Sequence, residues 1–289
     1  EMQRSLVGSE MCIRDRYRPC CEQEARDKAV AIRDLLEQHA YTPDHPGYIE
    51  ILARDWSYNP ANQGSNINPE GESTRTMNTH LHLIEAYTGL LRVLRTPEQI
   101  AKVRQHLNIM LDKVYDSEIH HFKMFFRDDW SWTTPEISYG HDIESSWLID
   151  WGCDLLGDAA LSKRIHAINS DLAAHIYKEA YIDHSVVNEC ERGKVNTTRV
   201  WWVQAESVLG FVNEYNKSGD AKYRDAAADI YHYICNVMVD KRPGSEWFWE
   251  VDADGKPSSR KPILEPWKCP YHNGRMCMEL IRRNPDVTV

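Results

Sequence analysis

The feature that most constrains the fold is a repeat of helix pairs with a period of roughly 60 residues. Apolar residues recur at helical spacing in successive segments, and short links or turn-rich aromatic stretches separate these segments. The predicted helices span residues 22–41, 76–95, 97–115, 138–156, 158–177, 196–215, 220–238 and 270–282. Such a repeat indicates stacked helix pairs, because no single pair can bury its apolar face alone.

The two helices of each later pair differ in character. The first is apolar on most sides, which suits an inner ring, whereas the second carries charge along one face, which suits an outer ring. Such pairs can form an open solenoid or close into an α/α toroid. Clusters of polar residues begin the inner helices, and they can converge on one pocket only if the ring closes. We therefore expect an all-α fold, an (α/α)6 toroid with short β-hairpin loops.

The toroid is expected to be incomplete, with about eight of its twelve helices present and the missing ones on the N-terminal side. Residues 1–21 show no helical or alternating period and resemble a translated sequencing adapter. We interpret them as a non-native or disordered tail, an unusual native tail being the alternative, and residues 22–289 as a partial catalytic domain. An open toroid exposes apolar helix flanks, so we expect poor solubility or oligomerisation.

Composition excludes several classes of protein. The net charge is -10 and the basic residues are dispersed, so the basic stripe of a nucleic-acid-binding protein is missing. No apolar run approaches the ~20 residues of a membrane span, and no secretion signal opens the chain. The eight cysteines lack the paired Cys-x-x-Cys spacing of zinc sites. A reduced, cytoplasmic chain is expected.

Four clusters of polar and aromatic residues begin apolar helices. They are Asn78-Thr-His-Leu-His-Leu-Ile-Glu-Ala-Tyr87, Tyr139-Gly-His-Asp-Ile-Glu-Ser-Ser-Trp147, Trp201-Trp-Val-Gln-Ala-Glu206 and Pro266-Trp-Lys-Cys-Pro-Tyr-His-Asn-Gly-Arg275. Helical residues three or four apart share a face. This spacing pairs Asn78 with His82, His141 with Glu144, and Trp202 with Glu206, whereas His80 points away from His82.

Each pair admits a structural and a functional interpretation. A helical histidine is usually a satisfied core or surface residue, His141 and Glu144 could form a cap and an ion pair, and a buried tryptophan usually serves packing. The functional alternative is a histidine base held by a carboxylate, with Trp202 and Glu206 offering a pyranose a flat apolar face and a hydroxyl acceptor. Cys269 and His272 could suggest zinc, but no second ligand pair accompanies them, so we expect no metal.

In this order and spacing, over residues 22–283, the four clusters resemble the signature blocks of cellobiose 2-epimerases, members of the N-acylglucosamine 2-epimerase superfamily with an (α/α)6 barrel. The resemblance implies that His141 and His272 are the acid/base catalysts and that His82 contacts the reacting sugar carbons. The substrate-binding residues expected are Asn78, Glu144, Trp202, Glu206 and Trp267. The implied substrate is the reducing-end glucose unit of a β-1,4-linked disaccharide such as cellobiose or lactose.

Two histidines suit epimerisation at C2 of an aldose, because imidazole titrates near neutral pH and can both remove and return a proton. The enediolate needs hydrogen-bond or cationic stabilisation, and neither a metal nor an organic cofactor is required. The resemblance also implies an arginine on the first inner helix, which this chain lacks. Arg75 and Arg92 do not match its motif, which puts the activity of this chain in question.

Two other functions remain open. One is an α/α-toroid glycoside hydrolase that draws its acid/base pair from Asp142, Glu144 and Glu206. The histidines at two of the four helix starts, where a hydrolase would have carboxylates, argue against this function. The other is an inactive fragment that at most binds sugars. Cellobiose, lactose and mannosyl-glucose sugars remain alternative substrates, as do monomer and dimer.

Overall fold

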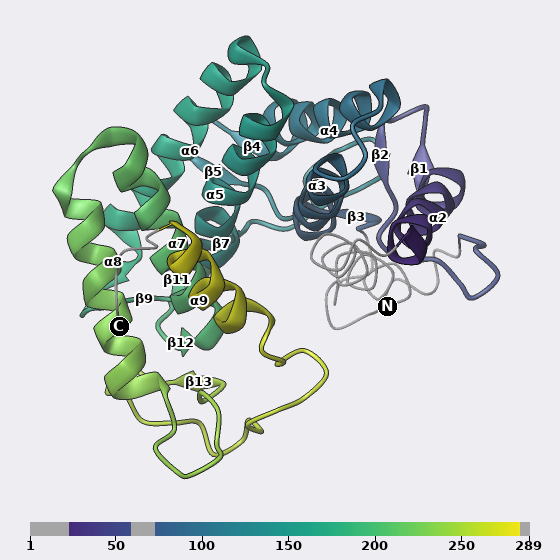
Figure 1. Cartoon of the computed structure of the whole chain (residues 1–289). Coiled ribbons are helices and arrows are strands. Elements are labelled where there is room, and N and C mark those ends of the chain that lie inside the picture. Colours follow the sequence, from purple (N-terminus) through teal and green to yellow (C-terminus); the bar gives the residue numbers. More distant parts are fainter. Residues whose placement is uncertain (1–22, 59–72, 284–289) are drawn as a thin grey trace. The chain divides into compact units, whose positions relative to one another are not determined.

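A computed structural model describes residues 23–58 and 73–283, and this part of the chain is mainly helical (Figure 1). Its α-helices are α2 (Gln23–His39), α3 (Met77–Leu91), α4 (Pro97–Ile109), α5 (Tyr139–Leu156), α6 (Ala159–Glu179), α7 (Trp201–Ser218), α8 (Ala221–Tyr233) and α9 (Tyr271–Arg283). The π-helical turns η2 (Met110–Val114) and η3 (Ile234–Met238) extend α4 and α8. The predicted helices are confirmed, whereas the predicted tail, residues 1–21, lies outside the described residues.

Short strands connect the helices. They are β1 (Tyr41–Thr42), β2 (Gly47–Tyr48), β3 (Arg75–Thr76), β4 (Tyr115–Asp116), β5 (His121–Phe122), β6 (Phe125–Phe126), β7 (Glu136–Ser138), β8 (Tyr181–Ile182), β9 (Ser185–Val186), β10 (Glu189–Glu191), β11 (Lys194–Asn196), β12 (Arg199–Val200) and β13 (Glu250–Val251). All pairings are antiparallel, in two-stranded sheets and one three-stranded sheet of order β11-β10-β7. The prediction of short β-hairpin loops is therefore confirmed.

One predicted boundary is wrong, and strand pairing explains it. Helix α7 begins at Trp201 and not at residue 196, because β11 pairs with β10 and β12 pairs with β13 before the helix starts. Strand β13 also opens a hairpin loop of the predicted kind, in which Val251 lies opposite Pro257 in an antiparallel bridge. This loop turns at Gly255, which has a φ of 78° and donates its N–H to the Asp252 carbonyl at 3.0 Å.

The chain divides into two compact units, which we describe separately. Unit 1 comprises Glu1–Pro135 and Leu148–His166, and unit 2 comprises Glu136–Trp147 and Ala167–Val289. Helices α5 and α6 each contribute residues to both units. The first half of α5, with α7 and α9, belongs to unit 2, so three of the four sequence clusters lie in the same compact body.

Unit 1 is built around α3. Thr76 begins this helix, since its hydroxyl accepts the Thr79 N–H at 3.1 Å as an N-cap does. Helix α4 packs alongside, and Gln99 donates from Nε2 to the Tyr87 carbonyl at 2.8 Å. Every residue of α3 is buried except Asn78 and His82, which lie one turn apart. The predicted inner position of this helix agrees with its burial.

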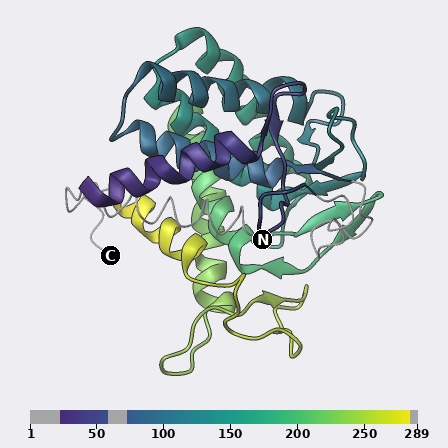
Figure 2. The same cartoon turned by 90° about the vertical axis from the view of Figure 1, so that its right-hand side faces the viewer.

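Unit 2 is built around α7, which packs against α8 and α9 (Figures 1 and 2). The helix ends at Gly219, whose φ of 71° is the left-handed conformation that glycine adopts without strain at a helix C-terminus. Asp220 then begins α8, since its carboxylate accepts the Lys222 N–H at 3.1 Å. Residues from Trp201 to Phe211 are all buried except Trp202. None of the described helices is long and apolar enough to cross a membrane.

Candidate active site

Four of the predicted site residues, Asn78, His82, His141 and Trp202, are the accessible positions of otherwise buried helix starts. In α5, His141 is the one residue from Tyr139 to Asp150 that is not buried, and Trp202 is the corresponding residue of α7. Asn78 and His82 are the corresponding pair in α3. A polar or aromatic side chain that stays accessible on a buried helix is typical of a binding site rather than of core packing.

In unit 2, His141 and His272 contact the same tryptophan. The His141 ring lies 4.7 Å from the Trp202 ring between centroids, and the His272 ring lies 5.4 Å from it. The distance between the centroids of the two imidazole rings therefore cannot exceed the sum of these two distances. Helices α5, α7 and α9 each supply one of the three rings, which brings residues that are distant in sequence into one site.

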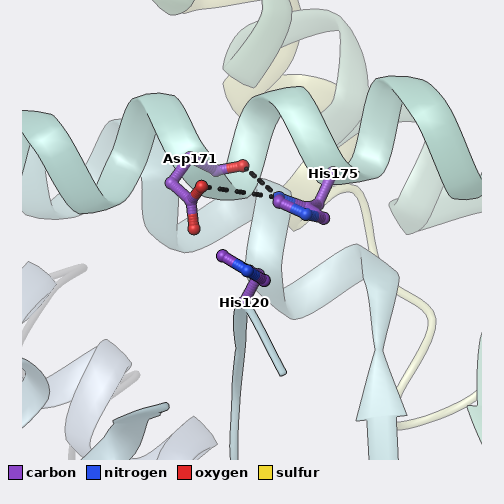
Figure 3. Close-up of side chains that lie close together, drawn as sticks. All are labelled: His120, Asp171 and His175. Atoms are coloured by element: carbon purple, nitrogen blue, oxygen red, sulfur yellow. Dashed lines mark hydrogen bonds and ion pairs between the residues drawn. The ribbon is translucent and has the colours of Figure 1, made fainter. Parts of the chain in front are cut away.

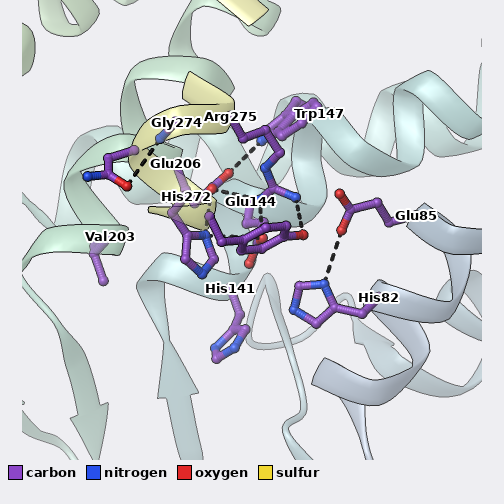
Figure 4. A network of polar contacts seen from close by, with 12 residues as sticks. His82, Glu85, His141, Glu144, Trp147, Val203, Glu206, His272, Gly274 and Arg275 are labelled. Carbon is purple, nitrogen blue, oxygen red and sulfur yellow. Dashed lines mark hydrogen bonds and ion pairs between the residues drawn. The ribbon is translucent and has the colours of Figure 1, made fainter. Parts of the chain in front are cut away.

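The Glu206 carboxylate, which is fully buried, is the centre of a hydrogen-bond network (Figure 4). Oε1 accepts from His272 Nδ1 at 2.8 Å and from Arg275 Nη2 at 2.7 Å, and Oε2 accepts from Trp147 Nε1 at 2.9 Å. Because an ionised carboxylate can only accept, His272 must carry a proton on Nδ1 in this arrangement. Its Nε2 is then the nitrogen that can exchange a proton with a substrate.

Neighbouring side chains stabilise the ionised form of Glu206. Burial alone would raise the pKa of this carboxyl, but the Arg275 guanidinium and the His272 hydrogen bond outweigh burial and lower the pKa to about 2. Glu206 therefore stays ionised at the pH at which enzymes work. It can orient His272 permanently, but it is unsuited to donating a proton.

The variant Glu206→Gln tests this charge. In the unaltered chain, ionised Glu206 contributes stability that is fully present above about pH 4.3, the pKa of an unfolded glutamate, and is lost as the pH falls through about 2. We expect the two proteins to differ most in free energy of unfolding above about pH 5, with the difference shrinking in acid. Urea unfolding across this range checks the sign. A difference that grows as the pH falls would contradict it.

Glu144 and His141 each contact other residues of unit 2. Glu144 is fully buried, accepts from Arg275 Nη2 at 2.5 Å, and lies 3.8 Å from His272 Nδ1. Its role in holding His141 stays a prediction, and its carboxylate also lies beside the second histidine. His141 Nδ1 lies 2.6 Å from the hydroxyl of Ser138, the last residue of β7. Strand β7 thus orients His141 at the start of α5.

Arg275 is the site residue that the sequence analysis missed. Its guanidinium lies over the rings of Trp147, at 5.0 Å, and Tyr271, at 4.5 Å, and it donates from Nη1 to the Tyr271 hydroxyl at 2.6 Å. It also bonds both buried glutamates, so it supplies the positive charge that lets two carboxylates lie side by side. The available signal was its spacing of three residues from His272 on α9.

The glutamates and His272 also have the spacing of metal ligands. The ligand atoms of Glu144, Glu206 and His272 lie within 4.8 Å of one another. Arg275 Nη2, however, donates to both carboxylates at 2.5 and 2.7 Å and therefore occupies the cationic position that a metal would take. These side chains fit a guanidinium-centred network.

The unit 1 candidates are described within that unit. His82 Nδ1 lies 3.2 Å from Glu85 Oε2, and the buried Asn78 Oδ1 accepts no hydrogen bond among the described residues. His80 is fully buried, with Nδ1 bonded to the Thr76 carbonyl at 2.7 Å and Nε2 accepting the Tyr48 N–H at 3.1 Å. Burial lowers the pKa of His80 to about 4. His80 is thus a satisfied core residue, as its position in the helix predicts.

Arg75, set aside in the sequence analysis, is a structural residue of unit 1. Its side chain is buried and donates from Nη1 to the His45 carbonyl at 2.6 Å and from Nη2 to Thr42 Oγ1 at 2.7 Å. Its guanidinium also lies 5.2 Å from the Trp130 ring centroid. These bonds hold the β1–β2 hairpin to the start of α3.

The segment before α9 is anchored in unit 2 by Lys268, whose side chain is fully buried and paired with Glu246. Its ammonium lies 5.6 Å from the centroid of the Trp201 ring, which gives that buried tryptophan a packing role. The preceding residue, Trp267, is half exposed. Its role as a stacking platform for a sugar stays a prediction.

Unit 2 also contains a histidine–carboxylate pair of a different kind. His175 and Asp171 lie one turn apart on α6, with the His175 Nδ1 atom 3.1 Å from the Asp171 carbonyl oxygen and 3.5 Å from its Oδ1 atom (Figure 3). Both side chains are partly exposed. This pair forms within one helix, whereas the His272–Glu206 pair joins two helices in the interior of the unit.

In this mainly helical fold, two imidazoles lie against one indole ring, and buried carboxylates hold the imidazole of His272. Such a site is typical of a carbohydrate-active enzyme. The N-acylglucosamine 2-epimerase (GlcNAc 2-epimerase) family matches residues 19–273, and the chain belongs to this family. It is a sugar 2-epimerase and hence an isomerase, as the sequence clusters predict.

Relatives of this chain in several bacteria are named cellobiose 2-epimerases. The chain is 40% identical over 280 residues to a cellobiose 2-epimerase of Eubacterium cellulosolvens, covering 90% of this chain and 68% of that protein. It is 38% identical over 273 residues to a cellobiose 2-epimerase of Ruminococcus albus, covering 94% and 69%.

Among solved structures, a sugar epimerase from a ruminal bacterium matches with a TM-score of 0.94 at 35% identity, covering 99% of this chain and 72% of that one. The cellobiose 2-epimerase of Bacillus thermoamylovorans B4167 matches with a TM-score of 0.92 at 36% identity, covering 96% and 71%. A D-mannose isomerase, 18% identical with a TM-score of 0.78, shares the fold.

Proposed function

We propose that this chain interconverts the reducing-end glucose and mannose units of β-1,4-linked disaccharides, with cellobiose as the first substrate to test. The observation that carries the proposal is the placement of His141 and His272 against the same Trp202 ring. The relatives that are 38–40% identical and named cellobiose 2-epimerases support the choice of sugar.

The proposed chemistry consists of two proton transfers at C2, one from each face. After ring opening, one imidazole removes the proton from C2 beside the aldehyde, and the electron pair becomes an enediolate. The other imidazole returns a proton to C2 from the opposite face, so the product is an isomer and nothing is oxidised or reduced. When His272 accepts the proton on Nε2, ionised Glu206 stabilises the imidazolium through Nδ1. Trp202 offers an apolar face to the pyranose.

The remaining site residues complete this proposal. Asn78 and His82 contact the sugar near its reacting carbons, Glu144 and Glu206 orient the histidines and hydroxyl groups, and Trp267 stacks on a sugar ring. The helices belong to an (α/α)6 toroid, of which this chain supplies about eight of twelve helices. Support comes from the solved relatives, which match with TM-scores of 0.94 and 0.92 although the chain covers 72% and 71% of them.

The hydrolase alternative meets an obstacle in the same network. A glycosidase needs a carboxylic acid that can donate a proton to the leaving oxygen. Glu206 is held ionised by Arg275 and His272, with a pKa lowered to about 2, and Glu144 bonds the same guanidinium. These two carboxylates are therefore poorly suited to that role.

Incubation with cellobiose tests the proposal. Chromatography is expected to show a glucosyl-mannose product, and in D2O the recovered sugar is expected to carry deuterium at C2. Release of monosaccharides would indicate the hydrolase. Unchanged cellobiose without deuterium would show that the chain as given has no epimerase activity.

A further inference from the structure

Helices α5 and α7 approach each other closely at two glycines. A Cβ atom on Gly140 would lie 2.5 Å from Trp202 Cη2 and 2.7 Å from Val203 Cγ2. A Cβ atom on Gly210 would lie 2.5 Å from Ile143 Cγ1 and 2.7 Å from the Ile143 carbonyl oxygen. Neither glycine has a positive φ, so lack of space, and not backbone conformation, excludes a larger residue. Glycine weakens a helix relative to alanine, so two of them inside helices require a reason.

The spacing of these glycines relates them to the buried carboxylates. Gly140 precedes Glu144 by four residues on α5, and Gly210 follows Glu206 by four residues on α7, so each glycine shares a helix face with one glutamate. Arg275 Nη2 donates to Oε1 of both glutamates, at 2.5 Å for Glu144 and 2.7 Å for Glu206. Glutamates on two helices can share one nitrogen only when the helices lie close together.

The same contact positions the tryptophan. Gly140 lies directly under the outer edge of the Trp202 ring, and this ring contacts both His141 and His272. A methyl group at residue 140 would have to displace the ring or the helix. Trp202 and Glu206 lie one turn apart on α7, so a displaced helix would also carry Glu206 away from His272.

We propose that Gly140 and Gly210 are positioning residues of the epimerase site. Gly140 sets the position of the Trp202 ring against the two histidines, and Gly210 sets the separation of α5 and α7 at which Glu144 and Glu206 share Arg275. The kinetic part of this inference rests on the proposed function, whereas its structural part does not.

Gly140→Ala and Gly210→Ala are the test variants, with Gly152→Ala as the matched control on α5. At Gly152 the closest atom to an added Cβ is Thr88 Oγ1 at 3.1 Å, which a side-chain adjustment accommodates. For Gly140→Ala we expect KM for cellobiose to rise about tenfold with a smaller change in kcat, because the sugar platform moves. For Gly210→Ala we expect kcat to fall about 10²-fold with an altered pH profile. Gly152→Ala should change neither.

Histidine NMR reads the site without turnover. With ¹⁵N-labelled histidine, Gly210→Ala is expected to shift the ring signals of His272, and Gly140→Ala to shift the ring signals of His141 and His272. Shifts of these signals without epimerisation by the unaltered chain would uphold the positioning and defeat the proposed function. Folded variants with unchanged ring signals and kinetics would overturn the inference.

A compensating variant covers the case in which Gly210→Ala does not fold. Ile143→Ala removes Cγ1 and Cδ1, the two side-chain atoms nearest the added methyl group. The double variant Gly210→Ala/Ile143→Ala is expected to recover folding and to bring the His272 ring signals part of the way back from those of Gly210→Ala. Recovery is expected to be partial because the Ile143 carbonyl oxygen, 2.7 Å from the added methyl group, stays in place. A double variant that folds but whose His272 ring signals lie farther from those of the unaltered chain than the signals of Gly210→Ala would overturn the role of this contact.

Discussion

Replacing His272 by alanine is expected to lower kcat for cellobiose epimerisation by at least about 10²-fold, the usual contribution of a positioned acid/base group. The imidazole is bonded through Nδ1 to ionised Glu206 and lies against Trp202, which leaves its Nε2 for the proton transfer that alanine cannot perform. Epimerisation requires both proton transfers, so formation of the glucosyl-mannose product should fall with kcat, whereas the His141 imidazole can still exchange the C2 proton of one epimer with D2O.

His175→Ala is the matched control for this variant. His175 also pairs with a carboxylate, Asp171, and its side chain is 20% exposed against 16% for His272. It should leave both rates unchanged. Wild-type formation of the glucosyl-mannose product by His272→Ala would contradict the assignment, because the second proton transfer would then proceed without this imidazole.

Replacing Arg275 by methionine is expected to lower the free energy of unfolding by about 3–5 kcal/mol, as when one partner of a buried ion pair is removed. Glu144 and Glu206 are fully buried, and both accept from Arg275 Nη2. Without the guanidinium they would place two uncompensated charges in the interior. Epimerase activity should be lost as well, since Glu206 could no longer hold His272 in place.

Urea unfolding at neutral pH measures this loss, with Arg282→Met as the control. Arg282 is 54% exposed and pairs with Glu279 on the surface of α9, so its replacement should cost at most about 1 kcal/mol. Arg275→Lys should fall between the two, because lysine keeps the charge but not the planar fork that reaches both carboxylates. Equal losses for Arg275→Met and Arg282→Met would refute the central role of the guanidinium.

The sequence was informative where local spacing carries the signal. Apolar periodicity predicted the helices, and the residues singled out at their starts, Asn78, His82, His141 and Trp202, proved to be the accessible positions of buried helices. Helical periodicity makes this possible, because a side chain's face follows from its number in the chain. Helix α7 was placed five residues too early because strand pairing with β13 is a long-range contact.

Helical spacing could not predict contacts between side chains on different helices. Spacing paired His141 with Glu144, but it could not show that Glu144 bonds Arg275 or that the Ser138 hydroxyl lies against His141. No role was predicted for Arg275, although it belongs to the fourth sequence cluster, because its partners Glu144 and Glu206 lie on α5 and α7.

By itself, then, the order of amino acids determined which segments coil, which residue types stand at the head of each helix, and to which family of sugar epimerases the chain is similar. Only the packed structure decided that Gly140 and Gly210 bring α5 against α7, and that Glu206 serves His272 under the control of Arg275. The reason is physical: a helix determines the direction of its own side chains, whereas the charge state of a buried carboxylate depends on neighbours contributed by other helices.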